Sequence, residues 1–228
     1  MLNLIKLDWL GMKVYHKRIV IVPLCVIIYG FFFEAIILPF MAFMMLMFSI
    51  NPFAVEEKGQ LDNLYLTLPV ARKNIVNARI GLSLIMQFIG LVVGIAATLA
   101  YNAFLYGRTV IFLRTFNADF NVMLLLVCAS LLLYAILNLS MFPILFRMGY
   151  AKGKALGVYI PTAVFTIAIF ALYMLWHFNS AFQISMIAVM VWAFSNTIWM
   201  AVILLSTAIL LLATSHFLSQ KAYAMREL

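Results

Sequence analysis

Long apolar runs separated by short polar stretches dominate the chain. They cover residues 19–50, 81–106, 121–146, 155–176 and 185–215. A run of about 20 apolar residues is long enough to cross a bilayer as a helix. The pattern therefore predicts an all-α integral membrane protein with short connections, a single transmembrane domain over residues 1–228.

Residues 19–50 decide the number of spans, because they are short for two crossings and long for one. If they form a hairpin, 13 Lys and Arg residues lie on the cytoplasmic side and 2 lie outside, whereas a single crossing gives 6 and 9. Cytoplasmic loops carry the excess of Lys and Arg, which favours the hairpin. We predict six spans with both termini inside, at residues 19–33, 35–50, 81–106, 121–146, 155–176 and 193–215.

Three segments outside these spans have their own predicted structure. Residues 1–18 mix apolar and basic side chains, which is typical of an amphipathic helix at the membrane interface, although a plain extension of the first span also fits. Residues 180–192 are predicted to form an outer segment that dips into the membrane before the last span, the alternative being one long tilted helix. Residues 216–228 form a charged cytoplasmic tail.

The composition excludes other classes of protein. Of the 228 residues, 67% are hydrophobic and 10% are charged, whereas soluble domains have about 25% charged residues. A soluble fold and a disordered chain are both excluded. The net charge of +8 is accounted for by basic cytoplasmic loops, so no nucleic-acid partner is expected.

Few residues could carry chemistry inside the membrane. The three histidines lie at span ends without metal-ligand spacing, and the glycine-rich stretch at Gly149–Ala155 lacks the spacing and hydroxyl of a phosphate-binding loop. We therefore expect no catalytic residue, no metal and no bound cofactor. Glu34 is the one charged residue within an apolar run; it is either a solvated turn residue or, with Asn196, part of an outer gate or substrate contact.

Residues 51–80 form the longest polar segment. The segment carries both signs of charge, and a set of apolar side chains gives it a second face: Leu61, Leu64, Tyr65, Leu66 and Leu68. Pro69 then breaks the helical pattern. A short amphipathic helix of this kind is suited to docking on a soluble partner. The alternative, a helix on lipid headgroups, is disfavoured because anionic lipid would repel its acidic cluster.

At this segment the chain resembles a known family. The string FAVEEKGQLDNLYLTLPVARKNIVNAR, residues 53–79, resembles the first cytoplasmic loop of ABC-2 type permeases. Within that family it is similar to the short permeases of bacterial peptide exporters, such as those for phenol-soluble modulins. The glutamate pair, the TLPV turn and the arginine before the third span carry the resemblance.

The resemblance implies that this loop holds a coupling helix that sits in a groove of an ATP-binding subunit. The residues that would contact that subunit are Glu56, Glu57, Lys58, Leu61, Asp62, Tyr65, Pro69 and Arg72. The resemblance also implies a re-entrant segment near residues 180–192, and a homo- or heterodimer of permeases with two ATPase subunits that hold ATP and magnesium. Export across the bacterial cytoplasmic membrane follows from the resemblance alone.

The spans are poor in charge, which suits an amphipathic or hydrophobic cargo such as a peptide or a lipid. Two other functions remain open from the sequence. One is a membrane sensor or scaffold that recruits a cytoplasmic partner through residues 53–79. The other is an autonomous secondary carrier, which the lack of buried ionisable pairs argues against.

Overall fold

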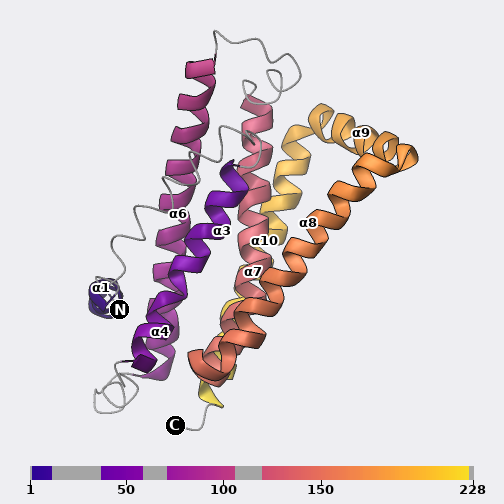
Figure 1. Cartoon of the computed structure of the whole chain (residues 1–228). Helices are drawn as coiled ribbons and strands as arrows, with labels where there is room; N and C mark the ends of the chain where they lie inside the picture. The colour runs from indigo at the N-terminus through magenta and orange to yellow at the C-terminus, as the bar shows by residue number, and fades with distance from the viewer. Residues whose placement is uncertain (1, 12–36, 59–70, 106–119, 226–228) are drawn as a thin grey trace.

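Every element of the computed structural model is a helix within the residues that it describes, which are 2–11, 37–58, 71–105 and 120–225 (Figure 1). The elements are α1 (Leu2–Gly11), α3 (Ile37–Ser49), α4 (Asn51–Lys58), α6 (Arg72–Leu105), α7 (Phe120–Lys154), the π-helical turn η3 (Ala155–Tyr159), α8 (Ile160–Phe178), α9 (Ser180–Ser195) and α10 (Thr197–Ala224). The all-α prediction is confirmed for these residues. The first predicted span, residues 19–33, lies outside them.

Three helical stretches are long and apolar enough to cross a membrane, judged by length and composition. They are Arg72–Ala100, Phe120–Phe178 and Thr197–Ala224, and shorter apolar helices cover Phe43–Glu56 and Ser180–Ser195. The second stretch reverses direction between α7 and α8 (Figure 1). The count of six spans stays a prediction.

Residues 147–154, which the basic sequence RMGYAKGK predicts as a short loop, form a tight turn between helices. Gly149 is the one described residue that reverses the backbone, with φ 72°, a conformation that costs glycine little because it has no Cβ. The next turns pass close to α7, since a Cβ on Gly157 would lie 3.2 Å from Ile144 Cγ2. Helix therefore continues on both sides of one glycine.

Two other helices extend beyond the predicted limits. α6 begins at Arg72, before residue 81, and its first turns bury Ile75 and Val76 in the core. α10 continues to Ala224 through the predicted tail and buries Tyr223. Buried apolar side chains stabilise these extensions despite the charges beside them. A helix can extend past the bilayer, so the span limits themselves stay predictions.

α9 lies between α8 and α10 at one end of the bundle (Figure 1). Its start is capped by Asn179, whose Oδ1 accepts a hydrogen bond from the Phe182 backbone N–H at 3.0 Å. It ends at Asn196, which has non-helical angles of φ −120° and ψ 41°. The helix therefore runs to Ser195, three residues past the predicted segment 180–192, and α10 begins at Thr197 instead of residue 193.

The buried core joins α3, α4, α6, α7 and α10. Its aromatic part lies where α4 meets α7: the ring centroids of Phe53 and Phe146 are 4.9 Å apart at 74°, and Phe146 lies 5.6 Å from Tyr223. Edge-to-face contacts of this kind stabilise a core beyond the area they bury. This core fixes α4 firmly against the long helices.

The charged side chains of the described residues gather at one end of the bundle. Residues 80–105, 120–146 and 155–220 contain no Asp, Glu, Lys or Arg. The charges belong to α1, α4, the start of α6, the α7–α8 turn and the end of α10, and Figure 1 places α4, this turn and the end of α10 together. We call this region the charged end; α9 lies at the opposite end.

Candidate functional site

Arg79 is buried at the charged end, two turns into α6, with 2% of its surface exposed. It lies in the stripe of α6 that faces the core, together with Ile75, Val76 and Leu82. A helix rise of about 1.5 Å per residue puts it about 10 Å from the start of α6. An arginine in such a stripe is rare unless it is paired.

Two carboxylates from different helices face this arginine. Arg79 Nη2 lies 2.5 Å from Glu56 Oε2 on α4, and Arg79 Nε lies 3.9 Å from Asp8 Oδ2 on α1. Glu56 is 3% exposed and Asp8 is 8% exposed. The three residues, which we call the ionic junction, connect the N-terminal helix and the segment after α3 to the long helix α6.

An aromatic ring closes the junction on another side. The Arg79 Cζ atom lies 4.3 Å from the ring centroid of Phe53, and a guanidinium at this distance is attracted by the face of the ring. Removing one partner of a buried ion pair typically costs about 3–5 kcal/mol, because the other charge stays buried. The junction therefore resists separation of α4 from α6.

A second polar feature, which we call the polar ladder, crosses the interior from α3 to α10. Ser83 Oγ lies 3.2 Å from Ser49 Oγ and 2.7 Å from Tyr134 Oη. Asn138 Nδ2 donates to Tyr134 Oη at 3.2 Å, and Ser215 Oγ donates to Asn138 Oδ1 at 2.7 Å. All five side chains are buried. The ladder joins four helices through α6 and α7.

The proton positions along the ladder follow from counting donors. Ser49 Oγ donates to the Leu46 carbonyl at 2.6 Å, so it must accept from Ser83. A hydroxyl has one proton, so Ser83 accepts from Tyr134. Every hydroxyl of the ladder therefore donates in one direction, from Ser215 toward α3. Changing Ser83, Tyr134 or Asn138 therefore leaves two neighbours without one partner.

Two further polar side chains of α6 are Asn77 and Gln87. Gln220 Nε2 on α10 donates to Asn77 Oδ1 at 3.0 Å, close to the ionic junction in the sequence of α6. Gln87, one turn beyond Ser83, is 2% exposed, and neither atom of its amide has a hydrogen-bond partner among the described residues. One face of α6 thus carries the junction, the ladder and a buried amide.

The residues predicted to contact the ATP-binding subunit do not all lie on an exposed face of the segment. Glu56 is buried, with Arg79 as its internal partner, because α4 packs its side against the core. Arg72 is exposed at the start of α6, and Glu57 and Lys58 belong to the last turn of α4. Leu61, Asp62, Tyr65 and Pro69 lie outside the described residues, as does Glu34.

Asn196, the other proposed gate residue, lies at the junction of α9 and α10. Its Nδ2 donates to the Trp192 carbonyl and to Ser195 Oγ, each at 3.1 Å. These contacts give Asn196 a role in ending α9. A role at an outer gate stays a prediction.

Asp8 and Arg79 were not among the predicted site residues. The sequence does mark both residues as unusual. Asp8 is the one acidic residue in residues 1–18, and Arg79 shares a helical face with apolar residues. A charge in an apolar stripe implies a buried partner. The identity of that partner requires the packing of α1, α4 and α6.

No group of three or more His, Cys, Asp or Glu side chains that could hold a metal ion occurs among the described residues.

Comparison with other proteins gives one match. A family model described as ABC-2 family transporter protein matches residues 3–224. Neither a curated protein nor a solved structure matches the chain.

Proposed function

Because this chain belongs to the ABC-2 family of transporter proteins, we propose that it is an exporter permease driven by a separate ATP-binding subunit that docks on residues 51–80. The family assignment supports a permease subunit. The partner, the cargo and the role of the docking segment are the proposal. The permease itself contributes no catalytic group, and the partner holds ATP and magnesium.

The ionic junction is the observation that carries this proposal. The docking segment begins with α4, and Glu56 ties α4 to α6 through Arg79. A displacement of the segment by the ATPase would therefore move α6 with it. The polar ladder would pass the displacement from α6 to α7 and α10, since Ser83 contacts Tyr134 and Asn138 contacts Ser215.

The distribution of charge supports the orientation. The charged end carries Lys and Arg residues that include Arg72, Lys73, Arg147, Lys152 and Lys221, as expected for the cytoplasmic side. The residue ranges of the opposite end carry no charge among those described. In this orientation α4 faces the ATPase, and α9 lies toward the outside of a bacterial plasma membrane.

The exposed apolar side chains indicate that lipid or another protein covers this surface in the membrane. Phe178, Ile198 and Trp199 are 84%, 75% and 70% exposed, so lipid or a second permease would cover them. A homo- or heterodimer would form the complete pathway. Since residues 80–105, 120–146 and 155–220 contain no charged side chain, we propose an amphipathic peptide or a lipid as the cargo.

The test is co-purification of the tagged chain from its native membranes in mild detergent, followed by mass spectrometry. We expect an ATP-binding subunit at near one-to-one ratio, and its loss in Asp62→Arg with the permease still monodisperse. Asn121→Glu, which adds a charge at the opposite end, is the matched control and should retain the subunit.

Other outcomes of these experiments would support a different function for the chain. A partner without ATPase activity, bound through residues 53–79, would make the chain a sensor or scaffold. Transport by the purified chain alone would make it a secondary carrier. Once the complex is reconstituted, amphipathic peptides should stimulate its ATPase activity; stimulation by small hydrophilic solutes alone would contradict the proposed cargo.

A further inference from the structure

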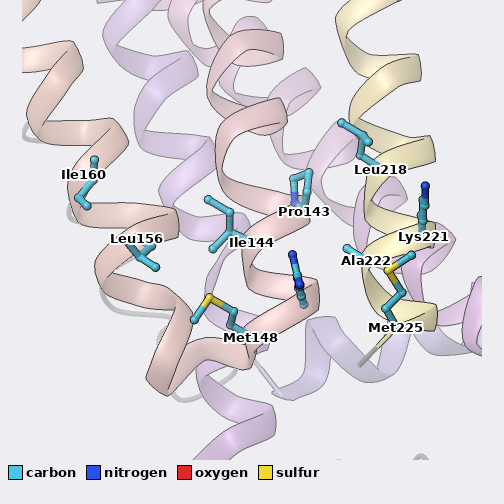
Figure 2. Close-up of a pocket in the computed structure, with 10 residues that line it drawn as sticks. Pro143, Ile144, Met148, Leu156, Ile160, Leu218, Lys221, Ala222 and Met225 are labelled. Atoms are coloured by element: carbon cyan, nitrogen blue, oxygen red, sulfur yellow. The ribbon is translucent and has the colours of Figure 1, made fainter. Parts of the chain in front are cut away.

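A groove lies at the charged end, away from the ionic junction. It is bounded by the end of α7, by η3 and the start of α8, and by the end of α10, and it encloses about 810 Å³. Figure 2 shows Leu156 and Ile160 on one side, Leu218 and Met225 on the other, and Ile144 between them. This volume lies within the range of small-molecule sites, about 300–1,000 Å³.

The groove combines an apolar lining with two cations. Arg147 from α7 and Lys221 from α10 both line it, and no acidic side chain does. Neither cation has an acidic partner among the described residues. Two cations beside one groove repel each other, so an anion bound between them would be favoured.

Exposed apolar side chains in the groove point to a ligand with hydrocarbon as well as negative charge. Leu156, Ile160 and Leu218 are 47%, 51% and 44% exposed. Such residues at a membrane surface are covered by acyl chains, while Lys and Arg contact headgroups. Basic pockets between helices on the cytoplasmic side are a recognised form of acidic-lipid site.

We propose that this groove binds an acidic phospholipid, whose phosphate lies between Arg147 and Lys221 and whose acyl chain lies along Ile144, Leu156 and Leu218. The bound lipid would bridge α7, α8 and α10 at the point where the chain turns at Gly149. The site is separate from the docking segment and needs no transported cargo.

The test measures lipid binding to the full-length chain in detergent by native mass spectrometry. Phosphatidylglycerol should bind in preference to phosphatidylcholine of the same acyl chains. In Arg147→Gln/Lys221→Gln this preference should fall by about fivefold for each charge removed, as expected for a basic residue near an acidic lipid surface. Lys152→Gln/Lys154→Gln, which removes two exposed cations of the same turn outside the groove, should keep the preference.

A second variant tests the acyl-chain part of the site. Leu218→Trp should fill the groove and weaken binding of both lipids without removing charge. Inorganic phosphate added in excess should not displace the lipid. Displacement by phosphate would assign the cations to a free anion, and equal lipid preference in the wild type and in Arg147→Gln/Lys221→Gln would overturn the proposal. A second copy of the chain seated in the groove itself, seen as a lipid-free dimer that Leu218→Trp disrupts, would also overturn it.

Discussion

Gly90 of α6 faces Met45 of α3 so closely that a Cβ on Gly90 would lie 2.6 Å from Met45 Cγ and 3.1 Å from Met45 Cβ. The absence of a side chain at Gly90 therefore sets the distance between α3 and α6. Small residues at such contacts let helices approach each other in membranes. The next glycine on the same face, Gly94, has its nearest heavy atoms at 3.5 Å, which is an ordinary contact.

These two glycines form a matched pair for testing the contact. Gly90→Ala should destabilise the protein by about 1–3 kcal/mol, because α3 must shift to admit the methyl group. Gly94→Ala should stay within about 1 kcal/mol of the wild type, since the methyl group fits and alanine favours helix. The measurement is the loss of the monodisperse peak in size-exclusion chromatography after heating in detergent. Equal stability of the two variants would show that α3 yields easily at Gly90.

The ionic junction predicts how a single variant and a double variant differ in stability. Glu56→Gln should destabilise the chain by about 3–5 kcal/mol, because it leaves the Arg79 guanidinium buried without its nearest carboxylate. Glu56→Met/Arg79→Met should recover part of this loss, since it removes both charges and keeps the volume. Lys73→Met is the control for an exposed cation on the same helix and should change stability by about 0.5 kcal/mol or less.

The same double variant separates stability from coupling. If the junction transmits movement from α4 to α6, the complex with Glu56→Met/Arg79→Met should assemble with the ATPase but lose cargo-stimulated ATP hydrolysis. Normal stimulation in that assembled complex would confine the junction to a structural role.

The polar ladder predicts a cost for removing one hydroxyl. Tyr134→Phe deprives both Ser83 and Asn138 of a partner, and should lower stability by about 1 kcal/mol, the typical value of an interhelical hydrogen bond in a membrane. Tyr159→Phe removes a hydroxyl from a residue that is 59% exposed and should have no measurable effect. Thermal unfolding in detergent compares the two.

The buried amide of Gln87 predicts an unusual gain. A buried polar group without a partner costs about 1–3 kcal/mol, so Gln87→Leu, which has similar volume, should be neutral or stabilising. Gln220→Leu should be destabilising, because Gln220 donates to Asn77 at 3.0 Å. A large loss of stability in Gln87→Leu would mean that the amide has a partner outside the described residues.

Much of the architecture could be predicted because it depends on local quantities. Apolar run length located the helical regions that include α6, α7, α8 and α10, and the paired asparagines Asn179 and Asn196 now account for the ends of α9. Residues 147–154 were predicted as a short basic loop, because their polar side chains are compatible with either helix or loop. The backbone angle of one glycine distinguished them.

The candidate site could be predicted only in part. The segment at residues 51–80 was identified from its charge and its resemblance to a family, but its first helix is buried against the core, and Glu56 points to Arg79. An amphipathic pattern shows that a helix has two faces. It does not show whether a neighbouring helix of the same chain or a soluble partner covers the polar one.

The sequence by itself determined that this is an all-helical membrane protein of the permease type, and where its charges lie along the chain. Composition and hydrophobic run length suffice for the membrane helices, because they set the cost of leaving each segment in water. The permease type rests on the resemblance of residues 53–79 to the family. Only the tertiary structure decided which residues meet: Arg79 with Glu56 and Asp8, and Ser215 with Asn138 across 77 positions. Such pairs depend on how the helices pack against one another, which no local pattern specifies.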